Sequence, residues 1–122
     1  NDTLAGSFGN DTLSGGNGSD IFRFDTALDA TSNLDSVIDF SVVDDSFQLE
    51  NGIFTSLTQT GTLAAGLFVI GTAALDANDK LIYDNTNGAL FYDADGSGSG
   101  GAIQFAVLGT SLALTNLDFV VT

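Results

Sequence analysis

A nine-residue period at the start of the chain constrains its fold more than any other feature. Two sets of residues keep this period in step, three acids and three apolar residues two positions later: Asp2, Asp11 and Asp20, and Leu4, Leu13 and Phe22. Glycines fall in the same register, so the unit reads G-(G/S)-x-G-x-D-x-(L/F)-x. Self-similarity at a short, fixed period indicates a coiled repeat architecture, in which each unit buries its apolar side chain against its neighbours.

Each position of the repeat has a physical role. Glycines permit backbone angles that are closed to other residues, so a six-residue turn can curl its carbonyl groups inward. The triplet after each Asp is a very short strand with one inward-pointing apolar side chain. We therefore expect an all-β fold that begins with a short, right-handed, parallel β-roll. Two repeats form one coil of this roll, and turns two repeats apart stack on each other.

The acidic residues indicate what holds the stacked turns together. Sixteen acids face only Arg23 and Lys80, for a formal net charge of -14, and every acid except Glu50 is Asp. A chain charged this strongly repels itself when it is compact. Asp carboxylates and inward-facing carbonyls are oxygen ligands of the kind that calcium binds, so a calcium ion between stacked turns would offset the repulsion.

The nonapeptides resemble those of the repeats-in-toxin (RTX, haemolysin-type) calcium-binding family. Three later segments are also similar to the stretch that closes the roll in that family, at residues 20–24, 35–40 and 45–49. The resemblance implies calcium as the cofactor and a terminal calcium ion held by Asp35 and Asp39. The alternative for these two acids is an ordinary outward-facing position on a strand. Asp44 and Asp45 are expected in a solvated turn.

Stacking at a spacing of two repeats predicts which turns share an ion. Asp20, with Gly16 and Gly18, should share one with Asp2. The turn at 6–11 lies on the opposite edge, where Asp29 is in register although residues 24–29 have lost the glycines; the resemblance offers a better partner in the closing stretch. The full set of candidate metal residues is Asp2, Gly6, Phe8, Gly9, Asp11, Gly15, Gly16, Gly18, Asp20, Asp29, Asp35, Asp39, Asp93 and Asp95.

Residues 51–122 are expected to form a mainly antiparallel β cap on a roll end made of residues 1–50, the two being one continuous module. Alternating apolar residues predict strands at 81–83, 89–92 and 102–108, and Asn87-Gly88 predicts a tight hairpin turn between the first two. The apolar run 63–75 is expected in the core. The loop at 93–99 resembles the first half of an EF-hand calcium loop, but Gln104 replaces its last acid, so a flexible Gly/Ser loop is the alternative.

Several function classes conflict with the composition. The chain has no Cys and no His, which excludes thiolate or histidine zinc sites and the Ser-His-Asp and Cys-His arrangements within it. We therefore expect no enzyme activity of its own. Two basic residues cannot build a phosphate-binding surface for nucleic acid, and the longest apolar run is too short to span a bilayer.

These observations predict the calcium-binding C-terminal module of a larger, secreted bacterial protein, cut from a longer parent because the chain lacks an initiator Met and enters a repeat midway. The RTX resemblance implies an extracellular or cell-surface location in a Gram-negative-type bacterium, folding on calcium outside the cell, and a type I secretion signal at the C-terminus, where residues 118–121 fit the family's ending. Expected partners are calcium ions, the type I transporter and upstream domains of the parent. The alternatives are a self-associating structural or adhesive surface module and the tail of a secreted protease or lipase.

Overall fold

The computed structural model describes residues 1–98 and 100–122 and is built almost entirely of β-strands. The first sheet has the strand order β1, β3, β5, β11 and β6, with bounds Thr3–Leu4, Ile21–Phe24, Ser46–Leu49, Phe119–Val121 and Gly61–Thr62. The second has the order β2, β4, β10, β9, β8 and β7, with bounds Thr12–Leu13, Asp35–Val37, Ile103–Val107, Ala89–Tyr92, Leu81–Asp84 and Phe68–Ile70. Two 3-10 turns, η1 (Ala65–Leu67) and η2 (Asn116–Asp118), precede β7 and β11. The predicted all-β class is confirmed.

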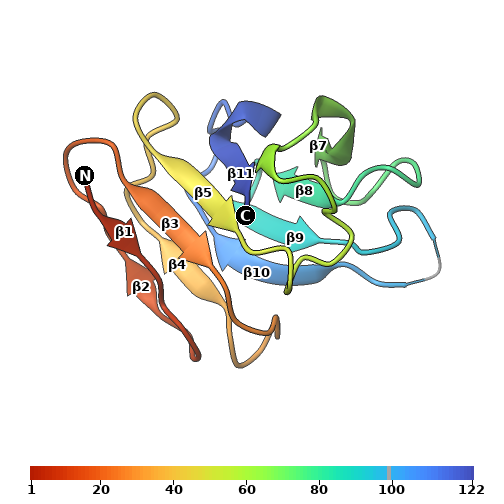
Figure 1. The fold of residues 1–122 in the computed structure, drawn as a ribbon, viewed down its shortest axis with the longest axis horizontal. Helices are drawn as coiled ribbons and strands as arrows, with labels where there is room; N and C mark the ends of the chain where they lie inside the picture. Colours follow the sequence, from red (N-terminus) through yellow and green to blue (C-terminus); the bar gives the residue numbers. More distant parts are fainter. Residues whose placement is uncertain (99) are drawn as a thin grey trace.

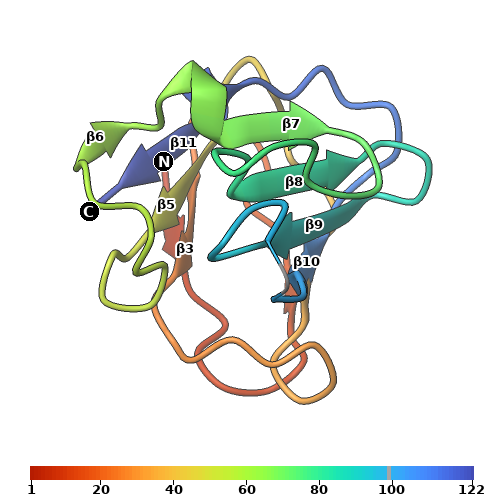
Figure 2. The ribbon, with the colours of Figure 1, turned by 90° about the vertical axis from the view of Figure 1, so that its right-hand side faces the viewer.

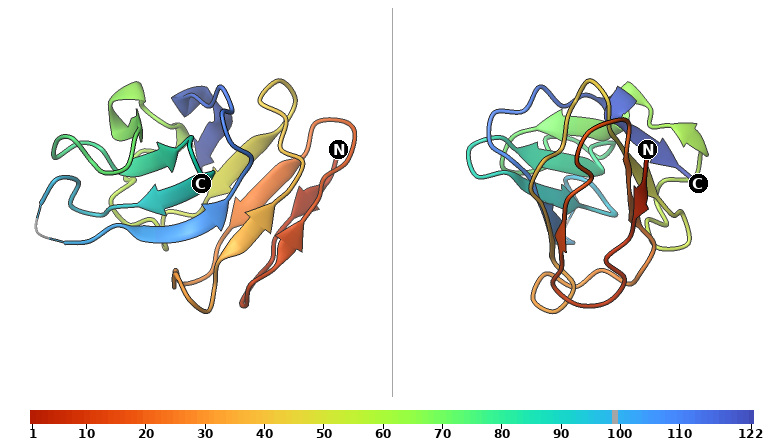
Figure 3. Two further views of the ribbon diagram at one scale, coloured as in Figure 1. Left: turned by 180° about the vertical axis from the view of Figure 1, so that it is seen from behind. Right: turned by 90° about the vertical axis from the view of Figure 1, so that its left-hand side faces the viewer.

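Strands β1 to β5 form the predicted parallel roll, with the chain passing alternately from one sheet to the other (Figure 1). Thr3 pairs with Ile21 in parallel, which is the spacing of two nonapeptides. In the second sheet, which forms the other wall, Thr12 pairs with Ser36 in parallel. This spacing is wider than two nonapeptides. Figure 3 (right panel) looks into the open end of the roll, where β1 and β2 lie on opposite walls.

The interior of the roll is filled by a column of Phe side chains. Phe22, Phe47 and Phe119 are fully buried and lie on β3, β5 and β11, which are neighbours in the first sheet. The rings of Phe40 and Phe47 stack with centroids 4.2 Å apart, and those of Phe47 and Phe119 with centroids 5.2 Å apart. Each buried Phe contributes roughly 1.5–3 kcal/mol by the area it removes from water, so this column is a main source of the stability of the roll.

The cap contains the predicted antiparallel meander. Strands β8 and β9 form a hairpin in which Leu81 pairs with Tyr92, and β10 continues the sheet antiparallel to β9 (Figure 2). The hairpin turn places Gly88 at a positive φ of 81°, where its N–H donates to the carbonyl of Asp84. Beyond β10 the sheet continues in parallel into β4 of the roll, so roll and cap share a sheet as well as a core.

The prediction that the run 63–75 lies in the core is largely wrong. Leu63 is buried, but Ile70 is 44% exposed and Leu75 is 79% exposed. The physical reason is topological: β7 is the last strand of the second sheet, so it has a neighbour on one side only. Local hydrophobicity predicts burial, but it does not predict that a strand will lie at an edge.

The C-terminal strand β11 occupies an interior position in the first sheet. It pairs in parallel with β5 and antiparallel with β6. Phe119 and Val121 are buried, and Thr115 and Asp118 form a capping box around η2 just before the strand. None of the helices in the described part of the chain is long and apolar enough to cross a membrane.

Candidate calcium sites

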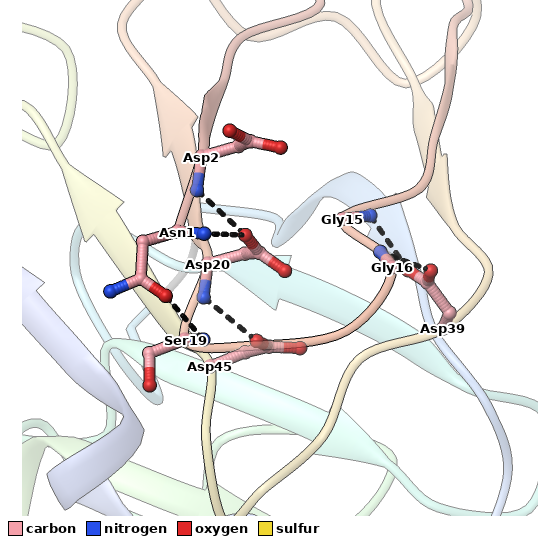
Figure 4. Close-up of polar contacts among 8 residues, drawn as sticks. All are labelled: Asn1, Asp2, Gly15, Gly16, Ser19, Asp20, Asp39 and Asp45. Carbon is pink, nitrogen blue, oxygen red and sulfur yellow. Dashed lines mark hydrogen bonds and ion pairs between the residues drawn. The ribbon is translucent and has the colours of Figure 1, made fainter.

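A row of Asp residues runs along one edge of the roll, each lying just before a strand of the first sheet. The backbone N–H of Asp2 donates to Asp20 Oδ1 at 2.7 Å, and the N–H of Asp20 donates to Asp45 Oδ1 at 2.9 Å (Figure 4). The parallel register of β1, β3 and β5 brings these residues level with one another. Stacking of successive turns therefore aligns carboxylates from different coils.

Asp20 has one carboxylate oxygen left over. Asp20 is only 1% exposed, and its Oδ2 is buried without a hydrogen-bond partner. The ammonium group of Asn1 lies 3.6 Å from the other oxygen, Oδ1. Gly15 faces the unpartnered oxygen, and a Cβ at that position would come within 2.5 Å of it. A buried carboxylate oxygen without a donor is costly, and the space beside this one is kept open by a glycine.

A second such arrangement lies on the opposite edge of the roll. The N–H of Asp11 donates to Asp35 Oδ1 at 3.0 Å, and Asp11 Oδ2 is buried without a partner. A Cβ on Gly6 would lie 2.8 Å from both Asp11 Oδ2 and Asp35 Oδ2, so carboxylates of two coils converge on this glycine. Burial raises the pKa of Asp35, and the negative charge of Asp11 raises it further. A cation at this point would relieve both effects.

Of the two partners considered for the turn at 6–11, the structure shows the one from the closing stretch. Asp29 does not stack on Asp11, because Asp35 takes that place after a longer connection between β3 and β4. Asp29 instead lies in its own exposed turn, where the N–H of Thr31 is the largest cause that lowers its pKa to about 2. Asp2 approaches Asp20 through its backbone N–H, while its own carboxylate is exposed; the stacking is as predicted, but the two carboxylates do not face each other.

Asp39 closes the turn of the second repeat. Its carboxylate accepts hydrogen bonds from the N–H of Gly15 at 3.0 Å, the N–H of Gly16 at 2.8 Å and the hydroxyl of Ser14 at 2.6 Å (Figure 4). These bonds, that of Ser14 first, lower the pKa of Asp39. Asp35 and Asp39, predicted as a pair, therefore face different turns of the roll, and calcium binding by Asp39 stays a prediction.

The remaining predicted residues belong to the turns themselves. Gly9, Gly16 and Gly18 have φ values of 112°, 81° and 107°, which lie in the left-handed region that favours glycine. The side chain of Phe8 is 74% exposed, so only its carbonyl could serve a metal. The turns are thus shaped by backbone conformation rather than by side-chain packing.

Comparison with known families agrees with this geometry. Residues 1–26 match the family model described as the RTX calcium-binding nonapeptide repeat (4 copies). Residues 1–26 therefore carry repeats of the RTX calcium-binding type. No curated protein and no solved structure is similar enough to the chain to extend this match. RTX repeats bind Ca²⁺ and form structural modules, and the proteins that carry them are typically secreted.

The residues of the RTX turns fit a calcium ion by their own chemistry. Asp11 Oδ2 and Asp20 Oδ2 are buried acceptors without donors, and each lies beside a glycine. Calcium takes six to eight oxygen ligands in flexible geometry, including backbone carbonyls. No group of three or more acidic side chains converges within residues 1–98 and 100–122, so backbone carbonyls would have to supply most of the ligands.

Asp45 is a buried member of this row of acids that sequence reasoning missed. It was expected in a solvated turn beside Asp44, yet it is only 6% exposed and accepts hydrogen bonds from the N–H groups of Asp20 and Ser41. A signal was present, because Asp45, Ser46 and Phe47 repeat the order of acid, spacer and Phe seen at residues 20–22. The row of Asp along this edge of the RTX roll therefore extends over three coils.

The cap loop at 93–99, predicted from the sequence, contains a third buried carboxylate oxygen without a partner. Asp93 is 6% exposed, and its Oδ1 has no hydrogen-bond partner. Burial raises the pKa of Asp93, and the adjacent Asp95 raises it further, whereas the N–H of Gly100 lowers the pKa of Asp95. Ser97, the third predicted oxygen donor of this loop, is exposed, and Ser99 lies outside the described residues.

Proposed function

We propose that this RTX module folds when it binds calcium outside the cell and that its C-terminal segment carries the export signal of a larger protein. In this proposal residues 1–50 are the calcium-binding end of the roll and residues 51–122 are the cap. The observation that carries it is the pair of buried, unpartnered carboxylate oxygens on Asp11 and Asp20, because such oxygens favour folding only when a cation is present.

The charge of the chain supports a switch between unfolded and folded states. With a net charge of -14, the compact state carries strong self-repulsion at low calcium. Calcium held by Asp20 on one edge, and by Asp11 and Asp35 on the other, would supply positive charge where carboxylates and turn carbonyls crowd together. Since these sites do not exist in the unfolded chain, the free energy of binding adds to the free energy of folding.

Export is the second part of the proposal. Residues 102–122 contain one ionisable side chain, Asp118. This low charge suits a segment that a transporter recognises in the unfolded state. The type I transporter is the partner that the RTX resemblance suggests. A chain kept open by low cytoplasmic calcium would pass through such a transporter, and calcium outside would then close the roll.

Hydrogen exchange of the backbone amides tests the folding switch directly. The N–H groups of Asp11 and Asp20 are donors between coils, so they should be protected in calcium and should exchange freely in a chelator. Hairpin amides of β8 and β9 report in parallel whether the cap folds with the roll. Equal protection of Asp11 and Asp20 in calcium and in chelator would reject the switch.

A second candidate function is self-association as a structural surface module. It is favoured by the position of β1 and β2, each of which is the terminal strand of its sheet and has one unpaired side. Light scattering in calcium over a range of protein concentrations separates the two functions. A constant mass supports an autonomous module, whereas growth with concentration supports assembly through the open end of the roll.

A further inference from the structure

Two loops of the cap are in direct backbone contact on the far side of the molecule from the RTX repeats. One is residues 76–80, before β8, and the other is residues 93–98, after β9. The N–H of Ser97 donates to the carbonyl of Asp76 at 3.0 Å. Gly96 is buried at a φ of 64°, and a Cβ there would come within 2.5 Å of the carbonyl oxygen of Ala77. The two loops therefore present carbonyl oxygens and no side chain at their closest approach.

Asp93 places an uncompensated acceptor at the base of these loops. Its N–H donates to the carbonyl of Lys80 at 2.8 Å, which fixes the residue at the open end of the β8–β9 hairpin. Although 94% of its surface is buried, Oδ1 has no hydrogen-bond partner. The carboxylate of Asp95 lies beside it. An unpartnered buried carboxylate next to a second carboxylate is unfavourable unless something positive is bound there.

The nearby lysine does not fill this role. Lys80 Nζ donates to the carbonyl of Ala94 at 3.1 Å. Within the described part of the chain, the ion pairs are those of Asn1 with Asp20 and of Arg23 with Asp25. Lys80 thus contributes a favourable field at Asp93 and Asp95 without contacting either carboxylate, and the Oδ1 position of Asp93 stays open.

We propose that a calcium ion binds between these two loops, held by Asp93 Oδ1, the carboxylate of Asp95 and backbone carbonyl oxygens of residues 76–80 and 93–98. Oxygen donors without nitrogen or sulfur suit a hard cation, and ligands drawn from two loops suit the flexible coordination of calcium better than the strict octahedron of magnesium. The ion would join the loop before β8 to the loop after β9. This site is separate from the repeats at residues 1–26, and it does not depend on calcium binding there.

Terbium luminescence distinguishes the cap site from the roll. The chain has two Tyr and no Trp, and both tyrosines, Tyr83 and Tyr92, are in the cap. Tyr92 directly precedes Asp93, so terbium bound in the cap loops should emit when tyrosine is excited, and calcium should displace it. Residues 1–50 contain Phe but no Tyr, so terbium bound in the roll should give much weaker tyrosine-excited emission.

Three variants of the whole 122-residue chain complete the test. Asp93→Asn and Asp95→Asn should each abolish the tyrosine-excited emission and lower the calorimetric calcium stoichiometry by one ion per chain. Asp44→Asn removes the same charge at an exposed position of the roll and should leave both readings unchanged. Because Asp95 is exposed, its variant keeps the fold even if the buried substitution does not. Unchanged emission and stoichiometry in Asp95→Asn would overturn the proposal and leave Asp93 as a buried, protonated acid.

Discussion

The backbone N–H of Asp20 donates a hydrogen bond of 2.9 Å to the carboxylate of Asp45, a residue 25 positions later in the chain. Asp20 is therefore the middle member of a row: it donates to Asp45, accepts from the N–H of Asp2, and still keeps Oδ2 free of any donor. One carboxylate joins coils of the roll and keeps one oxygen free for the proposed calcium ion. This double role makes Asp20 the most informative residue to change.

Asp20→Ala should weaken calcium binding more than Asp93→Ala. The first variant removes both a candidate ligand and the acceptor for Asp2, whereas the second removes one acceptor from the cap. Loss of a buried, charged hydrogen-bonding group costs on the order of 2 kcal/mol, which should appear as a lower free energy of unfolding in calcium. Calorimetric titration of both variants gives the order, and the reverse ranking would place the dominant site in the cap.

Calcium, and not magnesium, should order residues 1–49. Carbonyl-rich turns with two carboxylates suit a large ion with flexible coordination. At a free concentration about 100 times its dissociation constant, calcium should stabilise the fold by about 2.7 kcal/mol per site. Circular dichroism melts in calcium, magnesium and chelator make the comparison. Identical melting curves in the three conditions would contradict a calcium-specific roll.

Asp118 predicts a pH dependence that is opposite to that of an ion-paired acid. Burial raises the pKa of Asp118 above its ordinary value of 3.8. Its contribution to stability is therefore present below the unfolded pKa and is lost as the pH rises through the folded pKa. Asp118→Asn keeps an oxygen that can accept from the N–H of Thr115, so it should be more stable than the parent at neutral pH.

The measurement for Asp118→Asn is the difference in unfolding free energy between variant and parent, taken at each pH with calcium held in excess. The advantage of the variant should shrink as the pH falls toward 3.8. A difference that stays constant with pH would mean that the pKa of Asp118 is the same in the folded and the unfolded chain, and would contradict this prediction.

Gly88→Ala should destabilise the cap hairpin. The residue has a φ of 81°, and a Cβ there would overlap the carbonyl oxygen of Leu108. Strained backbone of this kind costs about 1–3 kcal/mol, to which the overlap adds. The matched control is Gly66→Ala, where a Cβ meets nothing within 4 Å; it should change the unfolding free energy by less than about 0.5 kcal/mol. Equal effects at the two positions would contradict this account of the turn.

Export and folding should respond differently to two changes at the C-terminus. Phe119→Ala empties a fully buried position at a cost of about 3–5 kcal/mol, so it should impair calcium-induced folding and leave export by a type I transporter intact. Deleting residues 117–122 should abolish both. The deletion should disturb the ordering of residues 1–49 as well, because β11 pairs with β5. Normal export of the truncated chain would place the signal elsewhere.

The sequence predicted features that depend on local chemistry and missed those that depend on connection length. The nine-residue period predicted the stacking of β1 on β3, and Asn87-Gly88 predicted the hairpin of β8 and β9. The residue that stacks on Asp11 could not be predicted from the period alone. The connection between β3 and β4 is longer than the period, so Asp35 takes the place of Asp29. Likewise, nothing in residues 119–121 indicates which strands they join.

The position of β11 also has a consequence for the order of events during synthesis. Its Phe119 pairs with Phe47, 72 residues earlier (119 minus 47). While the ribosome is making the intervening chain, β5 has no partner on that side, and the Phe column stays open to water. The first sheet therefore cannot be completed on a nascent chain that has reached only the cap hairpin. Assembly of this sheet can therefore be completed only after translation has delivered β11. Until then the chain lacks its full set of strand pairs and stays incompletely folded.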